Sequence, residues 1–248
     1  MNPLEEAFVW LATPDNWEAP IGIWQRLIEH AGYSGLTIVI AALIALPVGV
    51  AIGHTGRGRE IVVPFTGALR ALPTLGLVTL LALLLGTGLV PPLIALVILA
   101  VPPILAGAYS GLEAIDPATT DAARAIGFTR WQVIFQVELP LALPLIVGGM
   151  RAAALQVIAT WTVAAFLPLG GLGRFLIDGL AVRDYAQMLG GSLLVIALAL
   201  VVDVLFAAIE RWITPRGARA RASDRGTSLQ CRWSLPRPLW PNPRPVPS

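Results

Sequence analysis

Long apolar runs without charge constrain this chain more than any other feature. The 18 residues from Leu36 to Gly53 carry no charged side chain, and as an α-helix they would extend about 27 Å at 1.5 Å per residue. That length is just enough to cross the hydrocarbon core of a bilayer. Further apolar stretches follow at residues 61–86, 89–112, 139–167 and 188–209. The sequence therefore predicts an all-α membrane protein with about five transmembrane helices.

Composition supports this fold class and excludes several kinds of chemistry. Of the residues, 56% are apolar and 13% charged, against about 45–50% and 25% in soluble domains. All 17 basic residues are Arg, so the chain lacks the Lys of a phosphate-binding loop and of Schiff-base chemistry. A single Cys, Cys231, and two separated His, His30 and His54, offer neither an intrachain disulfide nor metal-ligand spacing. We expect no catalytic residue, no metal site and no cofactor in this chain.

The charge pattern divides the chain into three regions. Residues 1–34 carry five acidic residues and one Arg, and they lack the features of a signal peptide, so we expect an extracytoplasmic segment with an interfacial helix over residues 21–31. Residues 35–213 are predicted to form the transmembrane domain. Residues 214–248 are rich in Arg and Pro and are predicted to be a disordered cytoplasmic tail. Because Arg near span ends marks the cytoplasmic side, the N-terminus is expected outside and the C-terminus inside.

A polar loop over residues 113–138 is predicted to be cytoplasmic and is the most informative segment. Asp116 suits a helix N-cap, Pro117 suits the first helical position, and Gly127 can adopt the left-handed conformation that ends a helix. Thr129 and Gln132 then have the spacing of a capping box. The loop is therefore predicted to fold as a helix, a glycine turn and a second helix.

The same loop resembles the EAA loop of the membrane subunits of ATP-binding-cassette (ABC) importers. Asp121-Ala122-Ala123 is followed after three residues by Gly127 and after nine more by Val137-Glu138-Leu139-Pro140, with Asp in place of Glu and Val in place of Ile. In that family the loop docks into a separate ATPase subunit, which binds ATP and Mg. The resemblance implies an ATPase-coupling role for Asp116, Asp121, Ala122, Ala123, Gly127, Val137, Leu139 and Pro140.

Other segments narrow the resemblance to one branch. Residues 70–76, 101–105, 138–144 and 170–173 look like those of osmoprotectant permeases, which carry glycine betaine, choline or carnitine, although residues 166–169 lack the small side chains expected there. The resemblance implies a multi-pass protein of the inner (plasma) membrane with the type I importer (MetI-like) permease fold. It also implies an ATPase dimer, a second permease subunit, identical or paralogous, and a separate periplasmic or lipid-anchored binding protein as partners. Membrane lipid is a further partner, and nucleic acid is not expected.

Ionisable residues inside predicted spans need a partner or a function. Arg151 and Asp203 lie at similar depths and are predicted to form an intramembrane ion pair. Arg70, Pro73 and Thr74 are candidates for the translocation pathway or its gate, although Arg70 is equally well placed to reach the headgroups. Trp161 offers an indole face to a passing cation, and core packing is the alternative role for this residue.

Three other functions stay open at this point. A permease for amino acids or another small solute would have a nearly identical loop. An intramembrane enzyme would need convergent catalytic groups within the spans, and Asp203 is the only clear carboxylate there. A membrane scaffold without transport activity would have no ATPase partner.

Overall fold

The structure is a computed structural model that describes residues 2–18 and 20–213. Two compact units divide the chain, residues 1–211 and 212–248. Of the second unit, only Trp212 and Ile213 are described. The tail over residues 214–248, predicted to be disordered, lies outside the described residues.

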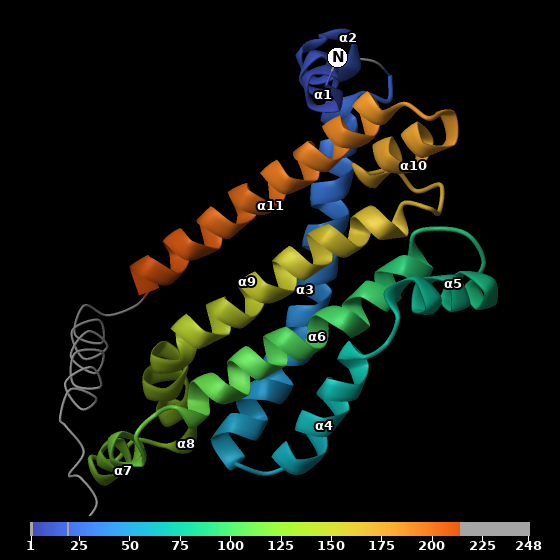
Figure 1. Cartoon of the computed structure of the whole chain (residues 1–248). Helices are drawn as coiled ribbons and strands as arrows, with labels where there is room; N and C mark the ends of the chain where they lie inside the picture. The colour runs from blue at the N-terminus through green and yellow to red at the C-terminus, as the bar shows by residue number, and fades with distance from the viewer. Residues whose placement is uncertain (1, 19, 214–248) are drawn as a thin grey trace, which may run out of the picture. The chain divides into compact units, whose positions relative to one another are not determined.

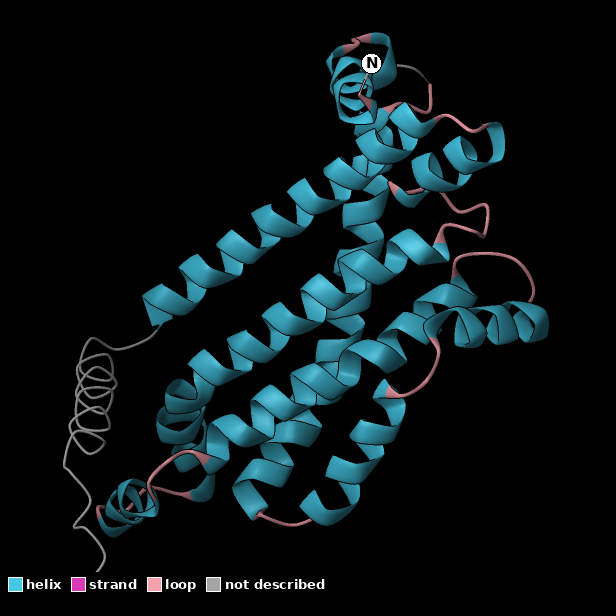
Figure 2. Cartoon of the chain, viewed as in Figure 1, coloured by secondary structure: helices cyan, strands magenta, loops and turns pink. Residues whose placement is uncertain are grey.

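The described residues form helices joined by short loops, without a strand (Figure 1, Figure 2). In chain order these are α1 (Pro3–Ala12), α2 (Asp15–Glu18), α3 (Ile23–Thr55), α4 (Arg59–Arg70), α5 (Thr74–Leu85), α6 (Val90–Glu113), α7 (Pro117–Ala125), α8 (Arg130–Val133), the π-helix η1 (Ile134–Glu138), α9 (Leu139–Ala164), α10 (Gly173–Val182) and α11 (Tyr185–Ile213). In Figure 1, α1, α2 and α10 lie at one end of the first unit, and α7 and α8 lie at the other.

Four of the described helices are long and apolar enough to cross a membrane: α3, α6, the continuous helix Arg130–Ala164, and α11. The predicted second crossing, residues 61–86, differs because it is a bent pair, with α4 and α5 meeting at 88°. Pro73 lacks an N–H to donate and disfavours helical backbone at Leu72, so the helix ends before it. Counted as one span, this pair gives the five crossings that the sequence predicts.

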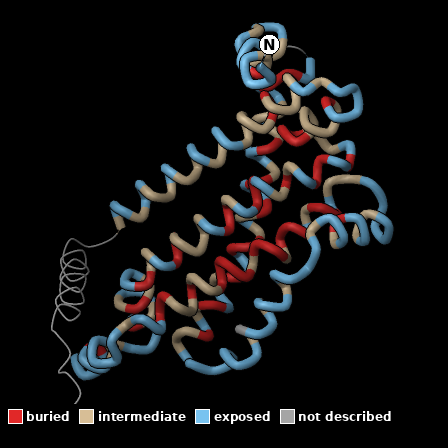
Figure 3. The backbone as a smooth tube through the Cα atoms, in the orientation of Figure 1, coloured by how far each residue is buried: buried red, intermediate tan, exposed pale blue. Residues whose placement is uncertain are grey.

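The core lies where α3, α6 and α9 pack together, as the buried residues in Figure 3 show. Small residues allow the close approach, as in other membrane helix pairs. A Cβ added at Gly107 of α6 would lie 2.6 Å from the carbonyl oxygen of Leu145, and one at Gly149 of α9 would lie 2.7 Å from that of Pro103. Gly49 of α3 likewise lies against Ala108 of α6.

The residues assigned to an interfacial helix form the first turns of α3. Gly32 and Gly35 weaken a helix but do not end it, and α3 runs without a break from Ile23 to Thr55. His30, which the interfacial arrangement would place in water, is only 1% exposed. Its Nε2–H lies 3.0 Å from the carbonyl oxygen of Ile158 on α9. The polar side of this segment therefore packs partly against the chain itself.

Candidate functional site: a capped loop helix above a basic pocket

Helix α7 forms where the sequence predicts the first helix of the loop. The Asp116 side chain accepts the N–H of Ala118 at 2.9 Å, and Pro117 occupies the first helical position. Gly127 has a φ of 97°, and the N–H of Phe128 reaches back to the carbonyl oxygen of Ala123 at 3.2 Å. Both ends of α7 are thus fixed by local hydrogen bonds, and its predicted start and glycine turn are confirmed.

The helix after the turn is continuous with a membrane span. Thr129 and Gln132 form both hydrogen bonds of the predicted capping box, and α8 passes through η1 into α9. At the end of η1 the N–H of Leu139 donates to the carbonyl oxygen of Ile134, five residues back, and the next residue, Pro140, has no N–H to donate. Val137, Leu139 and Pro140 therefore lie where the loop joins the span.

The loop presents an exposed surface that combines small and apolar side chains. Asp121 and Ala122 are exposed on α7, and the large apolar side chain of Ile126 is exposed just after it. The rings of Trp131 and Phe135 stack with centroids 6.0 Å apart and are also exposed. Ala123 differs, because it is only 7% exposed and anchors α7 to the rest of the chain. We call Asp121, Ala122, Ile126, Trp131 and Phe135 the loop surface.

One hydrogen bond links the loop to the first span. Nδ1–H of His54, in the last turn of α3, donates to Oε2 of Glu138 at 2.7 Å. Glu138 is the last residue of η1 and is 5% exposed. A buried carboxylate needs such a partner, and sequence reasoning missed this contact because the two residues are far apart in the chain.

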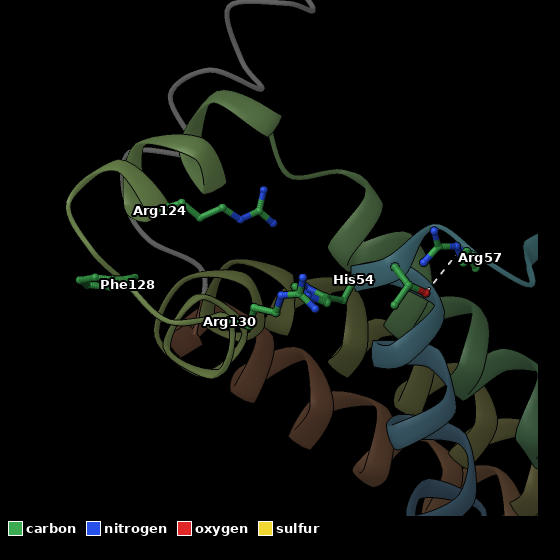
Figure 4. Close-up of a pocket in the computed structure, with 6 residues that line it drawn as sticks. His54, Arg57, Arg124, Phe128 and Arg130 are labelled. Atoms are coloured by element: carbon green, nitrogen blue, oxygen red, sulfur yellow. Dashed lines mark hydrogen bonds between the residues drawn. The ribbon is translucent and has the colours of Figure 1, made fainter.

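A basic pocket lies between the end of α3 and the loop (Figure 4). It has a volume of about 470 Å³, and its lining residues are His54, Thr55, Arg57, Arg124, Phe128 and Arg130. Figure 4 shows Arg124 extending from α7, with Arg130 and His54 close together and Arg57 on the far side. The pocket therefore gathers cationic side chains from three separate segments.

The two residues predicted to form an intramembrane pair lie together. Arg151 of α9 donates through Nε and Nη2 to the two carboxylate oxygens of Asp203, at 2.7 and 2.8 Å. Glu210 lies 3.6 Å from the same guanidinium group. This bidentate contact connects α9 to α11, a helix whose only buried residues are Gly190 and Gly191.

The predicted pathway residues lie in two places. Arg70, Pro73 and Thr74 occur together at the bend between α4 and α5, where Arg70 is exposed. Trp161 of α9 is 4% exposed, and its indole donates to Thr37 at 3.0 Å and packs against Tyr33. The structure thus places Trp161 in the core, and a pathway role for any of the four stays a prediction.

Polar contacts that sequence reasoning did not identify also join α3 to the loop before α10. The carboxylate of Glu29 accepts the N–H of Gly171 at 2.8 Å. One turn later, the Tyr33 hydroxyl donates to the carbonyl oxygen of Leu169 at 3.0 Å. Gly171 has a φ of 77°, which few other residues adopt. Gly171 is therefore the sequence signal that could have indicated a turn at this position.

The sequence is similar to membrane subunits of binding-protein-dependent transporters. The glycine betaine/carnitine/choline transport system permease protein OpuCB of Bacillus subtilis (strain 168) is 34% identical over 189 residues, covering 76% of this chain and 87% of that protein. The choline transport system permease protein OpuBB of the same organism is 33% identical, covering 77% and 88%. The osmoprotectant import permease protein OsmW of Salmonella typhimurium is 32% identical, covering 77% and 91%.

Solved structures share the fold. An inward-facing conformation of the MetNI methionine ABC transporter superposes with a TM-score of 0.69 at 21% identity, covering 78% of this chain and 96% of that one. The family model for binding-protein-dependent transport system inner membrane components matches residues 19–216, a range that includes the loop, the basic pocket and every described span from α3 onward. The chain therefore belongs to this family of multi-pass inner-membrane transport proteins.

Proposed function

We propose that this chain is the transmembrane subunit of an ATP-driven importer for a quaternary ammonium osmoprotectant such as glycine betaine, choline or carnitine. The observation that carries the transport role is the capped loop helix α7, which lies between two spans and adjoins an exposed apolar surface. A short helix with both ends fixed can pass a displacement to the spans without unfolding. A second subunit bound to the loop surface can therefore act on the spans.

The contacts of the loop support a route for this coupling. Helix α8 continues into α9, so a movement of the loop reaches the span that packs against α6. The hydrogen bond between His54 and Glu138 connects the same segment to α3. Closure of a partner ATPase on binding ATP would then move α7 and tilt α3 and α9 together, as a rigid-body change between inward-facing and outward-facing states.

The charge distribution supports the predicted orientation. Arg57 and Arg59 belong to the α3–α4 connection and the start of α4, and Arg124 and Arg130 belong to α7 and α8. These elements lie at the same end of the first unit (Figure 1), which is the cytoplasmic end by the positive-inside rule. Cys231 should then resist a membrane-impermeant thiol reagent in intact cells and react after permeabilisation. Equal labelling in both preparations would contradict the orientation with the N-terminus outside.

The proposed partners follow from the family. Binding-protein-dependent transport requires a receptor that delivers the solute and an ATPase that supplies energy, and the chain lacks the Lys of a phosphate-binding loop. We therefore propose an ATPase dimer, which binds ATP and Mg, and a separate receptor. A second permease copy, identical or paralogous, completes the pathway with the bend at Arg70, Pro73 and Thr74 as its gate.

The cargo is inferred from relatives named for osmoprotectant transport, at 32–34% identity. To test it, the permease is reconstituted in proteoliposomes with its ATPase and receptor, and the uptake of labelled glycine betaine, choline and carnitine is measured with and without ATP. An ATPase variant that binds but does not hydrolyse ATP is the control. ATP-dependent uptake of these compounds at high osmolarity is the expected result.

Two other results would change the proposal in different ways. Uptake of methionine or histidine, but of no quaternary ammonium compound, would keep the transport role and replace the cargo with an amino acid. A permease that associates with no ATPase and accumulates no solute would contradict the transport role itself and favour a membrane scaffold.

A further inference from the structure

Neighbouring carboxylates neutralise only part of the positive charge in the basic pocket. Arg124 pairs with Asp121 at 3.1 Å, and the carboxylate of Glu138 is bound by His54. In the part of the chain that the structure describes, no carboxylate lies within ion-pair distance of Arg57 or Arg130. Two guanidinium groups therefore face the pocket without an anionic partner.

The position of the pocket restricts what can occupy it. Arg124 lies on α7, and Phe128 and Arg130 belong to the turn and helix that follow. Asp121 of the loop surface pairs with Arg124 of the pocket at 3.1 Å, and Trp131 of the loop surface directly follows Arg130, so a protein bound to that surface lies against the pocket. Removing guanidinium groups from water is costly unless an anion is supplied. The protein that binds α7 must therefore bring negative charge to this place.

We infer that the basic pocket receives an acidic side chain, Asp or Glu, from the ATPase subunit. This inference rests on the proposed function, because that function places the ATPase on the loop surface. The guanidinium groups of Arg57 and Arg130 can donate paired hydrogen bonds to a carboxylate, and Phe128 supplies an apolar part of the pocket lining. The contact ties the ATPase both to the start of α8 and to the loop after α3, next to the bond between His54 and Glu138.

The test measures the affinity of the permease for its purified ATPase. The variants are Arg57→Gln, Arg130→Gln and the double variant, with Arg59→Gln as a matched control. Arg59 lies two residues from Arg57 but outside the pocket, where it pairs with the exposed Glu113. A charge-assisted hydrogen bond contributes enough for about a tenfold change in affinity. We expect Kd to rise about tenfold in each single variant and about a hundredfold in the double variant, with little change in the control.

A charge exchange identifies the partner residue. Arg130→Glu should weaken binding more than Arg130→Gln, and replacing one acidic residue on the ATPase surface with Arg should restore it. The salt dependence of binding should also be shallower in the double variant, because fewer opposite charges meet.

Specific results would overturn the inference. Binding of the pocket variants at the affinity of the unchanged protein would show that no acidic side chain enters the pocket. If the pocket variants lost ATPase binding only in nanodiscs that contain phosphatidylglycerol, and not in neutral phosphatidylcholine, the pocket would be assigned to an anionic lipid headgroup instead. If the unchanged permease did not bind the ATPase at all, the proposed function would fail, and the inference with it.

Discussion

His54 and Glu138 join the end of the first span to the start of α9 across 84 residues of sequence, with Nδ1 and Oε2 2.7 Å apart. Both side chains are largely shielded from solvent. The contact lies between the loop, where we propose that the ATPase binds, and the bundle of long helices. A change in this contact can therefore affect both folding and coupling.

The first prediction separates these two effects. His54→Ala leaves the Glu138 carboxylate buried without its partner and should cost about 3 kcal/mol of stability. Glu138→Gln keeps an oxygen that accepts from His54 and should cost about 1 kcal/mol. Thermal unfolding of the purified protein gives the stability of each variant, and receptor-stimulated ATPase activity of the assembled complex gives the coupling.

Substitutions of His54 and Glu138 should also have non-additive effects on stability. In a double-mutant cycle, His54→Ala and Glu138→Ala should show an interaction energy of about 1–3 kcal/mol. Additive effects would mean that the two residues act independently and that the bond does not link α3 to the loop.

The second prediction concerns the intramembrane pair of Arg151 and Asp203. Removing either partner leaves a charge inside the membrane, so Arg151→Leu and Asp203→Leu should each lower the unfolding temperature in lipid nanodiscs. The double variant should be more stable than either single variant, because it leaves no unpaired charge in this pair. A double variant less stable than both would show that the pair specifies the position of α11 rather than only neutralising charge.

The third prediction uses two adjacent glycines of α9 as a matched pair. An added Cβ at Gly149 meets the backbone of α6, whereas one at Gly148 has nothing within 4 Å. Gly149→Ala should therefore push α6 and α9 apart and cost about 1–3 kcal/mol. Gly148→Ala should be neutral or slightly stabilising, because Ala is the better helix former. Equal unfolding temperatures for the two variants would contradict the close packing.

Local signals in the sequence predicted the loop well. Asp116, Pro117, Gly127 and the capping box at Thr129 each act over a few residues, so their effect depends little on the rest of the fold. The spans were also predictable, because crossing hydrocarbon requires a long apolar helix whatever its neighbours. The pair of Arg151 and Asp203 was found from depth alone, since helical rise converts sequence position to depth.

Contacts between distant segments could not be predicted in this way. Glu138 lies between the coupling residues Val137 and Leu139, and nothing near it in sequence points to His54. An interfacial helix over residues 21–31 would expose His30 to water, yet packing against α9 buries it. Pro73 can either kink a helix or end it, and packing against neighbouring helices decides between the two outcomes. The bend after Arg70 could therefore not be predicted from the sequence alone.

The fourth prediction tests the turn after α7. Gly127 has a φ of 97°, and an added Cβ would meet no atom within 4 Å, so any cost of substitution comes from the backbone alone. Gly127→Val should cost about 1–3 kcal/mol, because a β-branched residue tolerates positive φ poorly. It should lower ATPase stimulation while the protein remains in the membrane.

Gly127→Asn is the matched control, because Asn adopts the left-handed region more readily. It should retain most of the stimulation that Gly127→Val loses. If both variants stimulated the ATPase as well as the unchanged protein, the position of α7 would not govern coupling.

The last prediction concerns where the cargo is recognised. A quaternary ammonium ion has no N–H to donate, so tight binding requires several aromatic faces around the cation. Among the described residues, close aromatic contacts occur as pairs, such as Tyr33 with Trp161 and Trp131 with Phe135. Trp161 is buried, and its indole already donates to Thr37. The isolated permease should therefore bind glycine betaine or choline too weakly for calorimetry to detect, while the complete system with its receptor accumulates them.

Substitutions at Trp161 distinguish packing from cargo contact. Trp161→Phe keeps an aromatic ring in the core but removes the donor to Thr37, so it should lower stability by about 1 kcal/mol and leave the KM for uptake unchanged. Trp161→Ala should cost about 3–5 kcal/mol through the cavity it creates. A large rise in KM for Trp161→Phe without loss of stability, or tight binding of betaine to the isolated permease, would place recognition in this chain rather than in the receptor.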